Sequence, residues 1–346
     1  MRTNLTRAVA LLALAAAVTA TPAPADAQQV EWPSYGSDVA GTKYTPLDQI
    51  NKDTVGDLEI VWRQSVLPDV IRGDREITAS IASQNTPLMA DGRLYISSGL
   101  GTVAALDAKT GEVLWFDEPP DRDGEPFQRV RQTRGVAYWE DPDSGEARVL
   151  AVVGAYLVAL DARTGERFPD FGDGGEVDLR KGYHRPVETF GWGSPPIVVG
   201  DIVVLGSSVS DIVSPQQPAL KLAAPGDVRG FNVRTGEQAW IFRTVPQEGE
   251  YGNDTWLTAI DQDRPSWEYT GHTNMWAWAS ADEELGYVYL PLSTPTNDYY
   301  GGYRPGDNLF AESIVCVDAR TGERVWHFQA VHHGLWDYDF PAAPNV

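Results

Sequence analysis

The chain has 346 residues, of which 49 are acidic and 27 basic, and its formal net charge is −22. Such a charge excludes nucleic acids and anionic membrane surfaces as partners, because both are themselves negatively charged, and it favours solubility. Aromatic residues make up 10% of the chain, which also contains 33 glycines and 24 prolines, and helical periodicity is scarce. This composition favours an all-β fold with many short strands and turns.

Residues 1–27 are expected to be a secretory signal peptide. Arg2 and Arg7 precede an apolar run from residue 9 to residue 18, and residues 25–27, Ala-Asp-Ala, offer a small-residue cleavage site. The apolar run is too short for a membrane span, and no later stretch is long and apolar enough to form a transmembrane segment. We therefore predict a mature domain over residues 28–346 with a periplasmic or extracellular location.

Four copies of one short phrase organise the rest of the chain. Each copy is an apolar strand, an Asp or Asn, a tight turn closed by Thr-Gly, and a second strand with an aromatic residue after the Gly. The Asp or Asn can accept N–H bonds in the turn, the Gly can adopt a positive φ, and an indole can pack one sheet on the next. Repeated hairpins of this kind predict the radially stacked sheets of a β-propeller. The copies occupy residues 105–115, 159–168, 230–240 and 316–326.

The second copy departs from the pattern, with Phe168 where the other copies have Trp. The intervals between copies lengthen toward the C-terminus, which is expected where inserted loops build a binding site. The lone cysteine, Cys316, lies in an apolar strand and is predicted to be buried rather than nucleophilic. Short buried strands are also predicted at residues 93–97, 148–153, 201–206 and 286–290.

The last repeat runs directly into a segment rich in aromatic, histidine and acidic residues, which ends at Asp339. Asp337 and Asp339 alternate with aromatic residues, and two carboxylates at this spacing could hold a cation and a general base in a dry, partly apolar pocket. The adjacent His332 and His333 suggest a transition-metal site, although neighbouring side chains diverge on an extended chain. The alternative for these histidines is a place in the pocket wall or in hydrogen bonding.

The chain resembles the pyrroloquinoline quinone (PQQ) dependent dehydrogenases, in particular the quinoprotein glucose and alcohol dehydrogenases. The similarity covers residues 31–346, from Trp-Pro-Ser-Tyr-Gly at residues 32–36 to Pro-Ala-Ala-Pro at residues 341–344. The repeated Thr-Gly-Glu-x-x-x-Trp phrase is similar to that family's tryptophan-docking motif. The resemblance implies an eight-bladed propeller, of which four motifs make about half. We therefore expect an N-terminal part of a longer protein, with further blades and an active-site Lys after Val346.

The resemblance also implies cofactor-binding residues. Arg134, in Arg-Gly-Val-Ala-Tyr-Trp, is implied to pair with a PQQ carboxylate, and Trp276, in Trp-Ala-Trp, to stack on the flat cofactor. Ser208 is implied to meet a PQQ carboxylate, and Asp211 to bind the metal. The alternatives are a surface ion pair for Arg134, one more interblade indole for Trp276, and turn-capping roles for Ser208 and Asp211.

In Trp-Asp-Tyr-Asp, Asp337 is implied to be the catalytic base and a metal ligand, and Asp339 a further ligand; a turn residue is the alternative for Asp337. Thr294 stands where the alcohol-oxidising relatives have an amide metal ligand, and Gln128-Arg129 where they have a vicinal disulfide. The implied metal is Ca²⁺, with Mg²⁺ or a lanthanide as alternatives, and the acid at position 339 resembles both the lanthanide-using relatives and the glucose-type group.

These observations lead to one hypothesis and two alternatives. The hypothesis is a periplasmic enzyme that oxidises a sugar or alcohol hydroxyl with PQQ and passes electrons to ubiquinone or a cytochrome c. No Cys-x-x-Cys-His haem-attachment motif is present, so the acceptor is expected to be separate or to lie beyond this chain. A non-catalytic periplasmic propeller scaffold explains the repeats but not the site residues. A hydrolase with paired carboxylates leaves Arg134 and Trp276 without a role.

Overall fold

The structure is a computed structural model that describes residues 30–65, 67–73, 84–97, 102–117, 134–188, 190–209 and 222–346. The predicted signal peptide, residues 1–27, lies outside these ranges. Within them the chain consists mainly of strands and loops, and no helix has the length and hydropathy needed to cross a bilayer.

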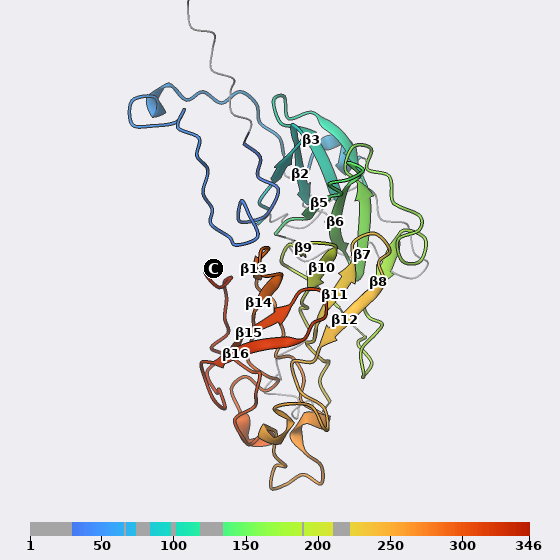
Figure 1. Ribbon diagram of the computed structural model, residues 1–346, viewed down its shortest axis with the longest axis vertical. Coiled ribbons are helices and arrows are strands. Elements are labelled where there is room, and N and C mark those ends of the chain that lie inside the picture. Colours follow the sequence, from blue (N-terminus) through green and yellow to red (C-terminus); the bar gives the residue numbers. More distant parts are fainter. Residues whose placement is uncertain are drawn as a thin grey trace, which may run out of the picture.

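The strands form four antiparallel sheets, each made of four consecutive strands. The sheets follow one another along an arc, from the β1–β4 sheet to the β13–β16 sheet (Figure 1). This arrangement confirms the prediction of an all-β propeller, with one blade for each repeat. The strands are β1 (Leu88–Ala90), β2 (Arg93–Ser97), β3 (Val103–Asp107), β4 (Val113–Phe116), β5 (Ala137–Glu140), β6 (Ala147–Val153), β7 (Tyr156–Asp161), β8 (Glu176–Asp178), β9 (Ile197–Val199), β10 (Ile202–Leu205), β11 (Val228–Asn232), β12 (Gln238–Phe242), β13 (Ser280–Asp282), β14 (Tyr287–Pro291), β15 (Ser313–Asp318) and β16 (Arg324–Gln329).

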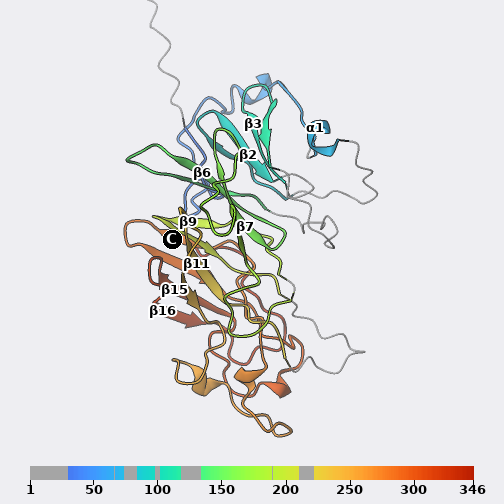
Figure 2. The same cartoon turned by 90° about the vertical axis from the view of Figure 1, so that its right-hand side faces the viewer.

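The helices within the described ranges are short and lie in connections. Three of them belong to the long insertions before β13 and between β14 and β15, and they gather at one end of the molecule, at the bottom of Figure 2. The same insertions carry two candidate site residues, Trp276 and Thr294, as expected for loops that build a binding site. The helices are η1 (Val55–Asp57), α1 (Asp69–Arg72), η2 (Asn253–Thr255), η3 (Ser266–Glu268) and η4 (Gly301–Tyr303).

The turn of each repeat has the hydrogen bonds that its sequence predicts. In the first repeat, Asp107 Oδ1 accepts N–H bonds from Lys109 at 2.9 Å and Thr110 at 2.7 Å. The glycines of the four turns all have φ between 72° and 76°, in the left-handed region that favours Gly. These bonds join residues at most three positions apart, so each hairpin turn is determined locally. Equivalent bonds are made by Asp161, Asn232 and Asp318.

A tryptophan joins the first blade to the second and the third to the fourth, and Trp62, which lies in a loop, packs on the turn of the first blade in the same way. The Trp115 indole lies against the turn of the second blade, where a Cβ on Gly165 would be 2.6 Å from the ring. Trp115 Nε1 also donates to the Ala162 carbonyl oxygen at 3.1 Å. The indole therefore fits only where the turn has a glycine, which explains why the Trp and the Thr-Gly turn repeat together. The same two contacts are made by Trp62 with Gly111 and Ala108, and by Trp240 with Gly322 and Ala319.

The junction between the second and third blades uses Arg148 in place of an indole. Arg148 Nη1 donates to the carbonyl oxygens of Val233 at 3.1 Å and Arg234 at 2.8 Å, and Val233 is the position equivalent to Ala162. The Arg148 guanidinium carbon lies 3.8 Å from the centroid of the Phe168 ring. Arg148 therefore supplies the N–H donor that an indole supplies elsewhere, and Phe168 packs on its guanidinium.

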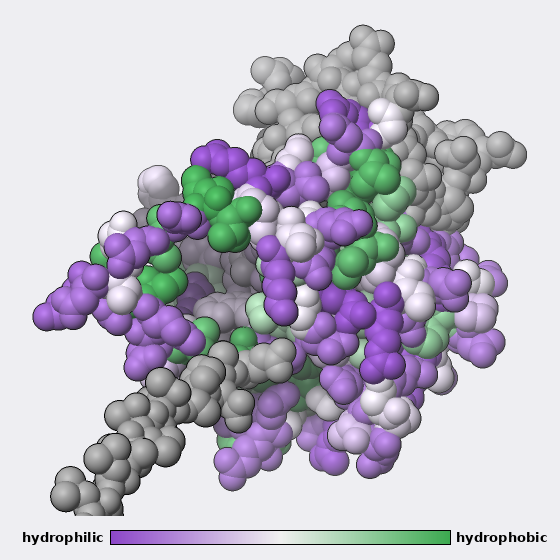
Figure 3. Space-filling view, turned by 90° about the horizontal axis from the view of Figure 1, so that it is seen from above, coloured by the Kyte–Doolittle hydropathy of each residue, from purple (hydrophilic) through white to green (hydrophobic). Residues whose placement is uncertain are grey.

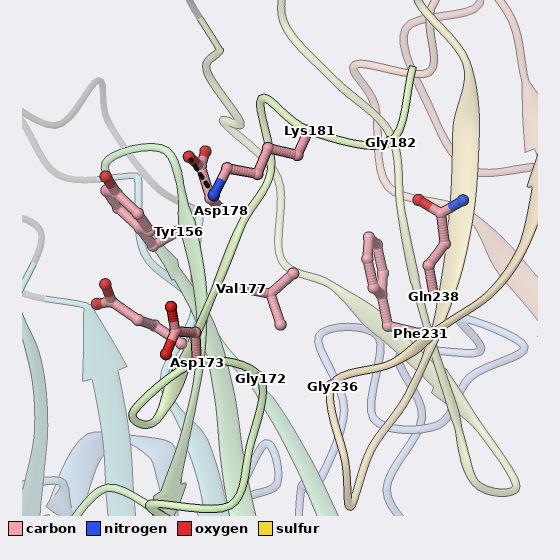
Figure 4. A pocket seen from close by; sticks show the side chains of 11 residues that line it. Tyr156, Gly172, Asp173, Val177, Asp178, Lys181, Gly182, Phe231, Gly236 and Gln238 are labelled. Carbon is pink, nitrogen blue, oxygen red and sulfur yellow. Dashed lines mark ion pairs between the residues drawn. The ribbon is translucent and has the colours of Figure 1, made fainter. Parts of the chain in front are cut away.

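A cleft of about 430 Å³ lies at this junction, beside Gly236. Figure 4 shows Val177 and Phe231 on its two sides, with Lys181 at the rim near Asp178. The Lys181 Nζ atom lies 3.9 Å from Asp178 Oδ2. A Cβ on Gly236 would be 2.8 Å from Val177 Cγ2, so a valine rather than an indole covers this turn.

Replacing Arg148 with Met is expected to lower the free energy of unfolding by about 1.5–3 kcal/mol, because the Val233 and Arg234 carbonyls lose a charged hydrogen-bond donor. Urea unfolding followed by tryptophan fluorescence measures this change. Arg163→Met is the matched control, since Arg163 is exposed in the turn of the same blade, and it should change stability by less than about 0.5 kcal/mol. Equal effects of the two variants would contradict this account of the junction.

The N-terminal segment links the first and fourth blades. The backbone of Trp32 exchanges two hydrogen bonds with Met89 of β1, both 2.9 Å long. Further along the segment, the Val39 carbonyl oxygen accepts from Ala281 N of β13 at 2.8 Å. Gly41, with φ 77°, lies so close to Trp278 that a Cβ would be 2.9 Å from the indole.

The face of the molecule seen from above is mainly hydrophilic, with hydrophobic residues in small separate groups (Figure 3).

The cysteine prediction is confirmed, since Cys316 is fully buried in β15 and has a free thiol. Burial raises the pKa of this thiol to about 11. At pH 8 only about one thiol in a thousand is then ionised, so Ellman's reagent is expected to leave Cys316 unmodified until the protein unfolds. Mass spectrometry of the peptide that contains Cys316 tests this prediction, and rapid modification in the folded protein would contradict it.

Candidate active site

Three neighbouring blades bring polar residues to the same end of their first strands. Arg134 lies three residues before β5, Ser194 three residues before β9, and Trp276 four residues before β13. Because β5 and β9 are in contact, the segments of Arg134 and Ser194 also lie side by side. The fold thus gathers residues that are far apart in the sequence at one end of the propeller.

Arg134 and Trp276 meet through Ser194. Arg134 Nη1 donates to Ser194 Oγ at 3.2 Å, and Ser194 Oγ donates to the Trp276 carbonyl oxygen at 2.7 Å. The Arg134 guanidinium carbon lies 5.6 Å from the centroid of the Trp276 ring. The sequence interpretation missed Ser194, which lies in a Gly-Ser-Pro-Pro run directly before β9.

The two tryptophans of Trp-Ala-Trp have different surroundings. Trp278 is buried and packs on Tyr35, with ring centroids 5.2 Å apart. Trp276 is half-buried, and its Nε1 donates to Asp339 Oδ2 at 2.7 Å rather than to the turn of a neighbouring blade. Trp276 therefore has a different role from the indoles that join the blades.

Asp339 connects the C-terminal segment to this cluster. Its Oδ1 accepts from the Thr294 backbone N–H at 2.8 Å, and its Oδ2 accepts from the Trp276 indole. Thr294 is fully buried, and its hydroxyl donates to Glu312 Oε1 at 3.1 Å. Four predicted site residues, Arg134, Trp276, Thr294 and Asp339, thus form one connected group.

Glu312 is a member of this group that the sequence interpretation missed. It is fully buried, and burial raises its pKa although the Thr294 hydroxyl and the Arg304 charge oppose the shift. The sequence pattern that could have indicated Glu312 is an acidic residue directly before the mainly apolar strand β15, in Ala-Glu-Ser-Ile-Val-Cys.

Asp337 lies beside this group with its carboxylate exposed. Its Oδ2 accepts from the Tyr299 hydroxyl at 3.0 Å, and its backbone has φ 57°. A left-handed backbone conformation is costly for any residue other than glycine, and such strained residues are concentrated at functional sites. The expected dry pocket around both carboxylates was wrong for the described residues, because Asp337 and its neighbours Trp336 and Tyr338 are exposed. Both carboxylates accept from the connection between β14 and β15, but only Asp339 also accepts from Trp276.

The segment that contains Ser208 lies next to Trp276. Ser208 N donates to the Gly191 carbonyl oxygen at 2.6 Å, and Ser207 N donates to the Met275 carbonyl oxygen at 3.1 Å. The Ser207 hydroxyl is buried and has no hydrogen-bond partner among the described residues. The predicted metal ligand Asp211 lies outside the described residues, and so does Gln128-Arg129.

The adjacent histidines contact neighbouring residues of one loop, and His333 has a left-handed backbone with φ 52°. His332 Nδ1 lies 3.7 Å from Asp307 Oδ2, and His333 Nδ1 lies 3.0 Å from the Gly306 carbonyl oxygen. In the described part of the chain, no three His, Cys, Asp or Glu side chains are grouped closely enough to hold a metal ion.

The residues present fit a flat, anionic cofactor and a hard cation. The half-buried indole of Trp276 offers a stacking surface, and the Arg134 guanidinium has further N–H donors for a carboxylate. The unpartnered Ser207 hydroxyl adds a donor beside them. Because the Thr294 hydroxyl gives its hydrogen to Glu312, its oxygen lone pairs remain for a cation such as Ca²⁺.

A four-bladed arc of docked sheets with such a cluster at one end defines the class of quinoprotein propellers. Residues 32–346 match the family described as PQQ: Glucose/ethanol/alcohol dehydrogenase, beta-propeller domain. The chain belongs to this family. This assignment agrees with the resemblance found in the sequence.

Curated relatives of the chain are named as quinoprotein dehydrogenases. Quinoprotein glucose dehydrogenase of Escherichia coli (strain K12) is 32% identical over 351 residues, which cover 94% of this chain and 40% of that protein. Quinoprotein glucose dehydrogenase A of Acinetobacter calcoaceticus is 30% identical over 364 residues, which cover 94% of this chain and 41% of that protein. The chain thus spans about 41% of the length of such relatives.

Solved structures agree with this fold. The quinohemoprotein alcohol dehydrogenase from Comamonas testosteroni superposes with a TM-score of 0.70 at 25% identity, over 91% of this chain and 43% of that one. A quinohemoprotein alcohol dehydrogenase from Pseudomonas putida HK5 gives a TM-score of 0.67 at 29% identity, over 90% and 41% of the two chains.

Proposed function

We propose that the protein is a PQQ-dependent dehydrogenase that oxidises a hydroxyl-bearing carbon of a sugar or alcohol. The observation that carries this proposal is the connected group of Arg134, Trp276, Thr294 and Asp339, in a chain of the glucose/ethanol/alcohol dehydrogenase family. Curated relatives named for glucose, glycerol and alcohol support the same class of substrate.

PQQ, when bound, supplies the two-electron acceptor for the hydride that leaves the substrate carbon. The chain's own residues would bind PQQ and accept the proton of the substrate hydroxyl. Arg134 and Ser208 would hold its carboxylates, and Trp276 would lie against its flat face, with the indole orientation fixed by the bond to Asp339. Asp337 would accept the hydroxyl proton at its carboxylate, so that one proton and one hydride leave the substrate together.

The cation in this proposal is Ca²⁺, with Mg²⁺ or a lanthanide as alternatives. Asp211, Thr294, Asp337 and Asp339 would supply its oxygen ligands, since a carboxylate oxygen that accepts one N–H bond has a second lone pair. A nearby cation would also keep the Asp337 carboxylate ionised, as a general base requires. We further propose a periplasmic location after removal of residues 1–27, and ubiquinone or a cytochrome c as the electron acceptor.

The test of this function is reconstitution of the whole protein with PQQ and each of Ca²⁺, Mg²⁺ and La³⁺. Glucose, other aldoses, polyols and primary alcohols are then assayed by reduction of an artificial dye acceptor. Substrate-dependent dye reduction that requires PQQ is expected. Absence of turnover with every cation and substrate, in protein that is folded by circular dichroism, would instead favour the non-catalytic scaffold.

A further inference from the structure

Two buried charged residues lie beneath the segment that carries Asp337. Glu312, directly before β15, and Arg304, directly after η4, are both fully buried. Burying a charge is costly unless partners compensate for it, so two such residues next to a functional segment require an explanation.

Glu312 contacts the segment of residues 334–339 at its beginning. A Cβ built on Gly334 would lie 1.7 Å from Glu312 Oε2, so only glycine allows the chain to pass this close to the carboxylate. The Tyr338 backbone N–H, which lies between Asp337 and Asp339 in the sequence, is also directed at Glu312 and lowers its pKa. Glu312 therefore faces both ends of the segment.

Arg304 holds the other side of Gly334. Its Nη2 donates to the Gly334 carbonyl oxygen at 2.6 Å and to the Asn297 carbonyl oxygen at 3.2 Å, and its Nη1 donates to Asn308 Oδ1 at 2.9 Å. The guanidinium thus ties the start of the Asp337 segment to the loop that precedes β15. With Glu312 on one side and Arg304 on the other, Gly334 has little freedom to move.

Glu312 also begins a chain of hydrogen bonds that ends at the stacking tryptophan. Thr294 Oγ1 donates to Glu312 Oε1 at 3.1 Å, Thr294 N donates to Asp339 Oδ1 at 2.8 Å, and Trp276 Nε1 donates to Asp339 Oδ2 at 2.7 Å. A hydroxyl has one hydrogen to give, so the bond to Glu312 decides which way the oxygen lone pairs of Thr294 point.

We propose that Glu312 is a positioning residue of the active site, which acts through the Thr294 hydroxyl and Gly334 to orient Thr294, Asp339 and the Asp337 segment. This inference rests on the proposed function for its kinetic consequence, but the hydrogen-bond chain itself has a readout without turnover. Glu312 does not act on substrate directly, because its carboxylate is buried beneath the segment.

The variants that test this role are Glu312→Ala, Glu312→Gln and Thr294→Val, with Glu323→Ala as the control in the exposed turn before β16. The Gln amide oxygen can still accept from Thr294, so Glu312→Gln is expected to stay within about threefold of the parent kcat. Glu312→Ala and Thr294→Val are each expected to lower kcat about 10- to 100-fold, as small misplacements of catalytic groups do, with KM changed less than threefold.

Coupling between the two residues separates positioning from a general structural role. Because Glu312 acts through Thr294, the kcat of the double variant Glu312→Ala with Thr294→Val should lie within about threefold of that of the slower single variant. Multiplied losses in the double variant, or a full-speed Thr294→Val protein, would overturn the proposal. A full-speed Thr294→Val protein overturns the proposal even if both Glu312 variants fail to fold, whereas a slow one supports it only together with the Glu312 variants, because Thr294 is also a proposed cation ligand.

The readout without turnover uses 5-fluorotryptophan, with the ¹⁹F signal of Trp276 assigned from Trp276→Phe. Glu312→Ala and Thr294→Val are expected to shift this signal, and Glu312→Gln and Glu323→Ala to leave it unchanged. If the signal shifts in a protein that shows no dehydrogenase activity, the positioning chain holds and the proposed function fails. If the protein is active but Glu312→Ala leaves both the signal and kcat unchanged, the positioning role is wrong.

Discussion

The Asp337→Asn protein is expected to lose about 10²- to 10⁴-fold in kcat and still bind PQQ, because an amide cannot accept the substrate proton as a carboxylate does. The exchange is close to neutral for the structure. Asn tolerates the left-handed backbone that Asp337 adopts, at φ 57°, and its amide oxygen can still accept from the Tyr299 hydroxyl. The loss should therefore be chemical and not a result of unfolding.

Two measurements check this result together. Dye reduction under saturating substrate gives kcat, and quenching of tryptophan fluorescence by PQQ gives the cofactor Kd, which should stay within about threefold of the parent value. Asp307→Asn is the matched control, since Asp307 is an exposed acid on a neighbouring loop whose carboxylate lies 3.7 Å from His332. Full turnover by Asp337→Asn would remove Asp337 from the role of base.

The second large effect concerns stability. Trp115→Ala is expected to cost about 3–5 kcal/mol, because it removes a buried indole from the junction between the first two blades and leaves a cavity. The exposed fraction of Trp115 is 8%, and its Nε1 donates to the Ala162 carbonyl oxygen, which would then keep only the hydrogen bond from the Tyr95 hydroxyl. The change is measured by urea unfolding at constant protein concentration.

Leu114 provides a control on the same strand. Its exposed fraction is 46%, and it is adjacent to Trp115 in β4. Leu114→Ala should change the free energy of unfolding by less than about 1 kcal/mol. If the two variants unfolded at the same urea concentration, the docking indoles would not be the main contacts between blades.

The repeated hairpins could be predicted because their determinants are local. The Asp or Asn accepts N–H bonds from residues two and three positions later, and the Gly closes the same turn. The docking indole follows four residues after that Gly in three of the four copies, so one motif specifies both the hairpin and its contact with the next blade. Trp62 escaped prediction because it lies in a loop and no Thr-Gly turn precedes it in the sequence.

Arg148 shows why the second junction could not be predicted. It lies 20 residues before Phe168 in the sequence, and its carbonyl partners Val233 and Arg234 lie 85 and 86 residues away. Nothing local in the sequence indicates that an arginine replaces an indole there. Only the packing of two blades brings the guanidinium to the carbonyls that the other junctions satisfy with Trp.

The sequence by itself determined the class of fold, the family and most of the candidate residues, because turn chemistry and short motifs act over a few positions. The tertiary structure decided how those residues are joined. Asp339 reaches Trp276 across 63 residues and Thr294 across 45, and these contacts exist only because successive blades end side by side. It also showed Glu312, a buried acid whose position beneath the Asp337 segment follows from the path of two long loops.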